Sequence, residues 1–258
     1  MVDHGKSTKR KKHHDKDKYY RLAKEQGLRS RAAFKLSQIN RQYSILTQSS
    51  STNGMVVLDL CAAPGGWTQI ASRECGPQTH IVAVDILPIR KLFPKSSSQQ
   101  TITTIVGDIT TDKCKSEINR AIAQVAATTA TNTQKKKKNN EGAGGGTVDV
   151  VLHDGAPNIG ASYDKDAYEQ IELAVHALRC ATHHLKRGGT FVTKIYRSRD
   201  SASYHWVIQQ LFETVTSFKP KASRPQSAEI FYICQGYHAP AKLDPRLLDP
   251  KHIFEMVQ

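Results

Sequence analysis

Five short apolar runs constrain this 258-residue chain more than any other feature, because each is rich in Val and Ile and is followed by a segment of helical period. They are MVVLDL, HIVAVD, TITTIVGD, VDVVLHD and TFVTKIY, which begin at Met55, His80, Thr101, Val148 and Thr190. Alternating strands and helices are the sign of repeated βαβ units. We therefore expect an α/β fold built around a mostly parallel sheet.

Charged residues stand at the carboxyl ends of these runs. In a doubly wound sheet the ligand lies across the carboxyl ends of the strands. The residues at these ends are Asp59, Asp85, Asp108, Asp154 and Lys194. We expect four carboxylates and one lysine to converge on one rim of the sheet.

The first run leads into the turn AAPGGW, residues 62–67, which does not fit the dinucleotide-binding pattern. A G-x-G-x-x-G turn offers backbone amides to a pyrophosphate. Here only Gly65 and Gly66 lack a Cβ, and Pro64 has no amide proton. The acids on the rim would also repel a pyrophosphate, so a nicotinamide oxidoreductase is disfavoured.

The rim suits a cationic or neutral ligand that carries ribose hydroxyls and an adenine. S-adenosylmethionine, with its sulfonium, ammonium and adenosine, has this character. We expect Asp85 to bond the ribose and Asp108 the base. Gly65 and Gly66 would let the backbone approach the ligand, and Trp67 would cover it. Capping of the following helix is the alternative role for any one of the aspartates.

The charge balance points to a polyanionic partner. Lys and Arg number 37 against 23 Asp and Glu, a formal net charge of +14, which fits RNA, DNA or an anionic membrane surface. No stretch approaches the roughly 20 continuous apolar residues of a membrane span, and the first thirty residues are too polar for a secretory signal. We expect a soluble intracellular protein that does not bind membranes.

The cysteines and histidines do not indicate a metal site. Five cysteines are scattered without a C-x-x-C pair. The adjacent pairs His13-His14 and His183-His184 lack the i, i+4 spacing that places two imidazoles on one helical face. We expect no metal, and reduced cysteines with structural roles.

The chain reads as one domain with a basic arm and one insertion. Residues 1–18 are almost without apolar side chains, which is typical of disorder; a solubilising tail, a nuclear localisation signal and an RNA contact are the alternatives for this arm. A low-complexity segment at about 126–146 contains four consecutive lysines and reads as a surface insertion, with an RNA role for the lysines as the alternative. Residues 19–258 otherwise form a single domain.

Two helices have clear periodicity. The first is amphipathic, with apolar positions at Ala33, Leu36, Ile39 and Tyr43. The second spans 165–185 and ends at KRGG. Its apolar stripe consists of Tyr168, Ile171, Val175, Leu178 and Leu185.

Six motifs, taken in order, resemble those of the FtsJ-type (RrmJ-type) S-adenosylmethionine-dependent ribose 2′-O-methyltransferases. The motifs are DLCAAPGGWTQ, VAVDILP, GDIT, LHDGAPN, GGTFVTKIYRS and SAEIFYICQGY. The resemblance runs from about Tyr19 to the end and is interrupted mainly by the insertion. It implies a Rossmann-like class I methyltransferase fold, with a mostly parallel seven-stranded sheet and helices on both faces, and S-adenosylmethionine as cofactor.

Within the family, HDGAPN and the tail APAKLDPRLLDPKHIFEMV look most like the Spb-type nucleolar enzymes that modify precursor rRNA of the large subunit. The branch that modifies the tRNA anticodon loop usually lacks the LDPRLLDP extension. The resemblance implies an enzyme of the nucleus and nucleolus that methylates pre-rRNA within a pre-60S particle. The alternatives are a tRNA 2′-O-methyltransferase and a non-catalytic RNA-binding assembly factor.

The family's catalytic tetrad of Lys, Asp, Lys and Glu falls on Lys35, Asp154, Lys194 and Glu229. Methyl transfer to a ribose 2′-hydroxyl needs a base near a poor nucleophile and in-line alignment with the sulfonium carbon. We assign Lys194 as that base or as the group that orients the hydroxyl. The intact tetrad argues against the non-catalytic alternative.

RNA is expected to lie over a positive face of the domain. The arginines assigned to phosphate contacts are Arg29, Arg31, Arg197, Arg199 and Arg224. Such contacts set position and salt dependence, with little influence on sequence choice.

Overall fold

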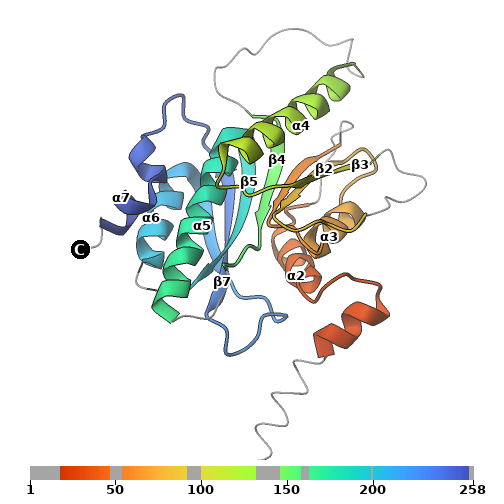
Figure 1. The fold of residues 1–258 in the computed structure, drawn as a ribbon, viewed down its shortest axis with the longest axis horizontal. Helices are drawn as coiled ribbons and strands as arrows, with labels where there is room; N and C mark the ends of the chain where they lie inside the picture. The colour runs from red at the N-terminus through yellow and green to blue at the C-terminus, as the bar shows by residue number, and fades with distance from the viewer. Residues whose placement is uncertain are drawn as a thin grey trace, which may run out of the picture.

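The structure, a computed structural model, describes residues 18–46, 54–91, 100–131, 146–157, 163–198 and 200–255. Seven strands form one sheet in the order β3-β2-β1-β4-β5-β7-β6 (Figure 1). The strands are β1 (Val56–Leu60), β2 (His80–Asp85), β3 (Thr101–Val106), β4 (Val148–His153), β5 (Leu185–Tyr196), β6 (Phe212–Phe218) and β7 (Glu229–Tyr237). The helices are α2 (Ala33–Tyr43), α3 (Gly66–Glu74), α4 (Asp112–Thr131), α5 (Tyr163–His184), α6 (Ser201–Leu211), the 3-10 helix η1 (Pro245–Leu248) and α7 (Pro250–Glu255).

Strands β1 to β5 pair in parallel, whereas β7 lies antiparallel between β5 and β6. The antiparallel register places Glu229, the first residue of β7, opposite Tyr196, the last residue of β5. Glu229 therefore lies at the same rim as the carboxyl ends of the parallel strands. Glu229 is thus close to Asp154 and Lys194 in space, although it is distant from Asp154 and Lys194 in the sequence.

Helices cover both faces of the sheet (Figure 1). On one face Ile118 of α4, Val175 of α5 and Val207 of α6 enter the core, and their exposed fractions are all 0%. On the other face Leu36 of α2 and Ile70 of α3 pack against the sheet. The predicted fold class, a mostly parallel seven-stranded sheet between two helical layers, is confirmed.

Some boundaries differ from the predicted ones. β5 begins at Leu185, which pairs with Val148 of β4, so KRGG belongs to the strand and does not form a separate helix stop. Tyr168 is 40% exposed and does not join the packing face of α5. α4 continues to Thr131, into the segment predicted as an insertion. Residues 1–17 and 132–145, with most of the predicted arm and insertion, lie outside the described residues.

Among the residues that the structure describes, no helix is both long enough and apolar enough to cross a bilayer. Nor does this part of the chain contain three His, Cys, Asp or Glu side chains grouped so that they could hold a metal ion. All five cysteines are free thiols.

Candidate active site

Four side chains from separate segments meet in one connected cluster of charges. Lys194 Nζ lies 3.1 Å from Asp154 Oδ1 and donates a hydrogen bond of 2.7 Å to the backbone oxygen of Asp154. Lys35 Nζ donates to Glu229 Oε2 at 3.0 Å and lies 3.6 Å from Asp154 Oδ1. Asp154 therefore bridges two lysines, and we call Lys35, Asp154, Lys194 and Glu229 the charged cluster.

The charged cluster is shielded from solvent. The exposed fraction of each side chain lies between 7% for Lys194 and 14% for Asp154. Lys35 is held there because Leu36 and Ile39, its neighbours on α2, are fully buried against the sheet. Ion pairs in such surroundings are screened less than surface pairs, and loss of one partner leaves an uncompensated charge.

Strand alternation decides which side chains join Lys194. Successive residues of a strand point to opposite faces, so Val192, Lys194 and Tyr196 face α2 while Ile195 enters the core on the other side. Burial, followed by the nearby carboxylate of Glu229, raises the pKa of the Tyr196 phenol. The sequence analysis did not select Tyr196, although its two-residue spacing from Lys194 places it on the same face.

A cavity of about 640 Å³ adjoins the charged cluster, with Asp154 in its wall. We call it the acidic cavity, because its carboxylates are Asp85, Asp108, Asp154, Glu169 and Glu172. Among the described residues that line it, none is Lys or Arg. Small-molecule sites commonly have volumes of about 300–1,000 Å³, so the cavity has the size and charge for a cationic ligand of cofactor size.

Asp85 and Asp108 face the acidic cavity and also hold their own turns. Asp85 accepts hydrogen bonds of 2.8 Å from the backbone N–H groups of Ala63 and Leu87. Asp108 accepts one of 2.9 Å from the N–H of Thr110, just before α4. The turn-capping alternative and the ligand-facing role therefore coexist, since each carboxylate oxygen has a second lone pair.

Asp59 does not line the acidic cavity, unlike the other three strand-end acids. Its side chain turns toward α3, where Thr68 donates a hydrogen bond of 2.6 Å to Oδ2. Burial raises the pKa of Asp59 to about 7, and the carboxylates of Asp154 and Asp85 add to the shift. Asp59 thus stabilises the first turn of α3 through its hydrogen bond with Thr68.

Comparison with known proteins places this site in a family. Residues 28–237 match the family described as FtsJ-like methyltransferase. The chain belongs to the FtsJ-like methyltransferase family.

Relatives of this FtsJ-like domain are similar over almost all of its length. The chain is 46% identical over 254 residues to the AdoMet-dependent rRNA methyltransferase spb1 of Schizosaccharomyces pombe, covering 98% of this chain and 28% of the relative. It is 46% identical over 242 residues to the pre-rRNA 2′-O-ribose RNA methyltransferase of Dictyostelium discoideum, covering 94% and 25%. The chain therefore spans about a quarter of the length of these curated relatives.

A solved structure shares the fold of this FtsJ-like domain. The crystal structure of a ribosomal RNA methyltransferase from Plasmodium falciparum superposes with a TM-score of 0.58 at 21% identity. The match covers 82% of this chain and all of that chain. It supports the fold assignment alone.

In this FtsJ-like domain the glycine turn faces the segment before α2. A Cβ on Gly66 would collide with Ser30 Oγ, and a Cβ on Gly65 would come within 3.2 Å of Arg29 Nη1. Gly65 also has a φ of 99°, a backbone conformation that favours glycine. Neither glycine lines the acidic cavity. Their small size permits close packing of the chain on itself, and their predicted approach to the cofactor stays a prediction.

Trp67 does not cover the acidic cavity. It is 3% exposed, its Nε1 donates a hydrogen bond of 2.9 Å to the carbonyl of Ala32, and its ring centroid lies 5.6 Å from that of Phe231. The side chain lies in the core because the first turn of α3 points it at α2 and β7. The predicted contact of Trp67 with the cofactor stays a prediction. Ile86 and Leu87 are exposed and line the cavity. Neither was predicted from the sequence as a site residue.

Arg29 forms hydrogen bonds to backbone carbonyls of the same chain, which was not predicted from the sequence. Its guanidinium donates to the carbonyls of Pro64 at 3.1 Å and Lys91 at 2.6 Å, and also to that of Arg90. The side chain therefore ties the segment before α2 to the glycine turn and to the chain after β2. The predicted phosphate contact of Arg29 stays a prediction.

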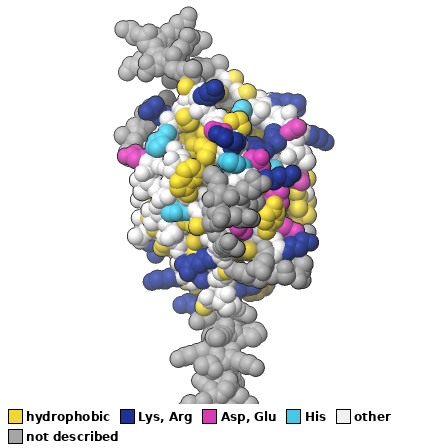
Figure 2. Space-filling model, turned by 90° about the vertical axis from the view of Figure 1, so that its left-hand side faces the viewer, with side chains coloured by type: hydrophobic (Ala, Val, Ile, Leu, Met, Phe, Trp, Pro, Cys, Tyr) yellow, Lys and Arg dark blue, Asp and Glu magenta, His cyan; other side chains and the backbone are white. Residues whose placement is uncertain are grey.

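The other predicted RNA contacts are Arg31, Arg197, Arg199 and Arg224. Arg31 donates to the carbonyl of Ala222 at 2.7 Å. Burial, with the nearby charge of Arg224 adding to it, lowers the pKa of Arg31. Both arginines line a recess of about 160 Å³. Arg197 follows β5 and is exposed, and Arg199 lies outside the described residues. On the face seen in Figure 2, Lys and Arg side chains lie around the edge rather than in one patch.

Proposed function

We propose that this FtsJ-like domain is an S-adenosylmethionine-dependent RNA ribose 2′-O-methyltransferase acting on large-subunit precursor rRNA. The observation that carries the proposal is the position of Asp154, which belongs both to the charged cluster and to the wall of the acidic cavity. Relatives described as rRNA and pre-rRNA methyltransferases support the choice of substrate. A nucleolar location and action on a pre-60S particle are part of the same proposal.

The acidic cavity fits the cofactor. Asp85 would accept hydrogen bonds from the ribose hydroxyls and Asp108 from the adenine amine, while Ile86 and Leu87 offer apolar contact. The carboxylates favour the positive charge of a sulfonium and an ammonium. When bound, S-adenosylmethionine supplies a methyl carbon activated by the adjacent sulfonium.

Lys194 is placed to act on the ribose 2′-hydroxyl. Its Nζ donates a hydrogen bond to the backbone oxygen of Asp154 and forms an ion pair with the carboxylate of the same residue. A neutral amine would take the hydroxyl proton with its lone pair, whereas an ammonium would donate an N–H to the oxygen and orient it. In both forms Lys194 would hold the ribose 2′-oxygen for in-line attack on the methyl carbon. Such positioning supplies a large part of catalysis in reactions of this kind.

Lys35 and Glu229 maintain the charge balance around this step. Lys35 contacts both carboxylates of the charged cluster, at 3.0 Å and 3.6 Å. Two ammonium groups and two carboxylates sum to zero charge, so removal of any one of them would leave an uncompensated, nearly buried charge. We assign Lys35 and Glu229 the role of positioning Asp154 and the incoming ribose.

The test is transfer of a labelled methyl group from S-adenosylmethionine to large-subunit precursor RNA. Lys194→Ala should lower incorporation by about 100-fold or more, as loss of a positioned acid–base group typically does. Lys186→Ala, at the exposed start of the same strand, is the matched control and should retain activity within about twofold of wild type. Equal incorporation by wild type and Lys194→Ala would remove Lys194 from the mechanism, and incorporation into tRNA alone would assign the domain to the tRNA branch.

A further inference from the structure

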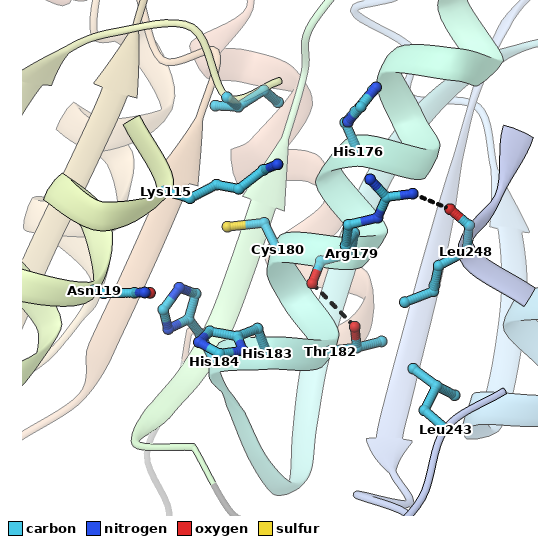
Figure 3. Close-up of a pocket in the computed structure, with 11 residues that line it drawn as sticks. Lys115, Asn119, His176, Arg179, Cys180, Thr182, His183, His184, Leu243 and Leu248 are labelled. Atoms are coloured by element: carbon cyan, nitrogen blue, oxygen red, sulfur yellow. Dashed lines mark hydrogen bonds between the residues drawn. The ribbon is translucent and has the colours of Figure 1, made fainter. Parts of the chain in front are cut away.

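A second cavity, of about 400 Å³, shares Ile109 and His176 with the acidic cavity. It lies between α4 and α5, and the chain around η1 forms its third side (Figure 3). We call it the cationic cavity, because Lys115 and Arg179 line it and no Asp or Glu does so among the described residues. Two neighbouring cavities of opposite charge require different ligands.

The two cations of the cationic cavity retain binding capacity. Lys115 reaches from α4 toward α5 (Figure 3) and pairs at 2.9 Å with Asp112, whose side chain is 98% exposed. Such a surface pair is weak because water and salt screen it. Arg179 uses one of its five N–H donors on the carbonyl of Leu248, at 2.6 Å. Both side chains can therefore donate to a phosphate.

The remaining lining is aromatic and apolar. His176 Nδ1 is buried and has no hydrogen-bond partner among the described residues. Burial, with Arg179 adding to it, lowers the pKa of His176, and burial lowers that of His184 to about 4. These rings are therefore neutral at pH 7, and with Leu248 they offer flat and apolar surface to a base.

We propose that the cationic cavity binds one nucleotide, with its phosphate between Lys115 and Arg179 and its base against the imidazoles and leucines of the lining. The volume is at the low end of small-molecule sites, about 300–1,000 Å³, and so suits a single nucleotide rather than an extended peptide. The nucleotide is either free or one unit of an RNA chain. This site is separate from methyl transfer and goes beyond the proposed function.

The experiment is equilibrium dialysis of radiolabelled AMP and UMP against the protein. S-adenosylhomocysteine is present in excess, so that an adenosine cannot occupy the acidic cavity. Lys115→Glu should weaken binding at least about tenfold, since hydrogen bonds to a charged group are lost and a repulsion is introduced. Lys113→Glu makes the same charge change at an exposed residue of α4 outside the cavity and should bind within about twofold of wild type.

A second variant, Lys115→Gln, removes the charge without repulsion and should give an intermediate loss. Absence of saturable binding to wild type in the millimolar range, or equal binding by Lys113→Glu and Lys115→Glu, would overturn the inference. Inorganic phosphate that binds as tightly as AMP and UMP would overturn the base contact. Methyl transfer measured on the same wild-type sample keeps this failure distinct from a failure of the proposed function.

A further arm identifies the source of the nucleotide. A six-nucleotide RNA is added to wild-type protein that holds labelled UMP. Displacement of UMP by the RNA supports a unit of an RNA chain as the occupant. Retention of UMP, with the loss in Lys115→Glu unchanged, supports a free nucleotide.

Discussion

Asp154 is the residue on which the site depends, because it meets both lysines through its carboxylate and Lys194 through its backbone oxygen. Its place directly after β4 lets one residue contact a helix of one layer, a neighbouring strand and the acidic cavity. Without this carboxylate two nearly buried ammonium groups would repel each other. The charge on Asp154 is therefore a structural requirement, and the proposed function gives it a catalytic role as well.

His153, next to Asp154, links the site to pH. It is fully buried and its Nδ1 lies 2.8 Å from Thr193 Oγ1. Burial, with Lys194 adding to it, lowers the pKa of His153 to about 3. In the unfolded chain a histidine has a pKa near 6.5, so as the pH falls below about 6.5 only the unfolded state gains this proton. The free energy of unfolding should therefore decrease as the pH is lowered from about 6.5 to about 3.

His153→Gln should make the free energy of unfolding less dependent on pH between about 6.5 and 4, by up to about 1.4 kcal/mol per pH unit. Urea unfolding at several pH values measures this slope. His238→Gln, at an exposed histidine, should keep the wild-type slope. A His153→Gln slope equal to that of wild type would show that His153 is not the group responsible.

At the scale of elements, the segment before α2 holds the glycine turn between β1 and α3. Arg29 bonds the carbonyl of Pro64, Ser30 contacts Gly66, and Ala32 accepts from Trp67. These contacts bring α2 against α3, and α2 carries Lys35 to Asp154. The glycine turn thus positions Lys35 of the charged cluster through packing.

Gly66→Ala tests this packing. The added Cβ meets Ser30 Oγ, and overpacking of this kind costs about 1–3 kcal/mol. Ser30 Oγ is buried without a hydrogen-bond partner among the described residues, so Ser30→Ala alone should cost little. The double variant should recover part of the loss, and thermal unfolding of the four proteins measures the coupling. A double variant as unstable as the sum of the single changes would show that the two side chains do not compete for space.

At the scale of the whole molecule, acidic and basic side chains gather in different places. The acidic cavity opens at the carboxyl ends of β1 to β4, although the chain as a whole carries a net charge of +14. The excess cations lie elsewhere, including the recess with Arg31 and Arg224. A cationic cofactor and a polyanionic substrate can therefore be attracted to different parts of the same domain.

Ligand-induced stabilisation tests this arrangement. A ligand present at 100 times its dissociation constant stabilises a protein by about 2.7 kcal/mol, so S-adenosylhomocysteine should raise the Tm while NAD should not. Asp85→Ala should remove most of the shift, because it deletes a carboxylate of the acidic cavity. Glu117→Ala, on α4 outside that cavity, is the control and should keep the shift. An equal shift with NAD, or an undiminished shift in Asp85→Ala, would contradict the assignment of the cavity.

The sequence predicted most of the sheet and part of the site. Strand periodicity located β1 to β5, and the position after each strand identified Asp85, Asp108 and Asp154 as rim residues. The motif order was enough to recognise the family. Periodicity alone did not select Lys35 or Glu229, which entered through the family resemblance, because a charged residue on a helix or at a strand end is usually solvated.

Only the tertiary structure decided which partner each side chain meets. Trp67 enters the core, Arg29 binds backbone carbonyls and Asp59 turns to Thr68, since segments distant in the chain supply those contacts. The antiparallel insertion of β7 between β5 and β6 brought Glu229 to Lys35. Local sequence determines the period and the ends of an element, whereas burial and pairing depend on what packs against it.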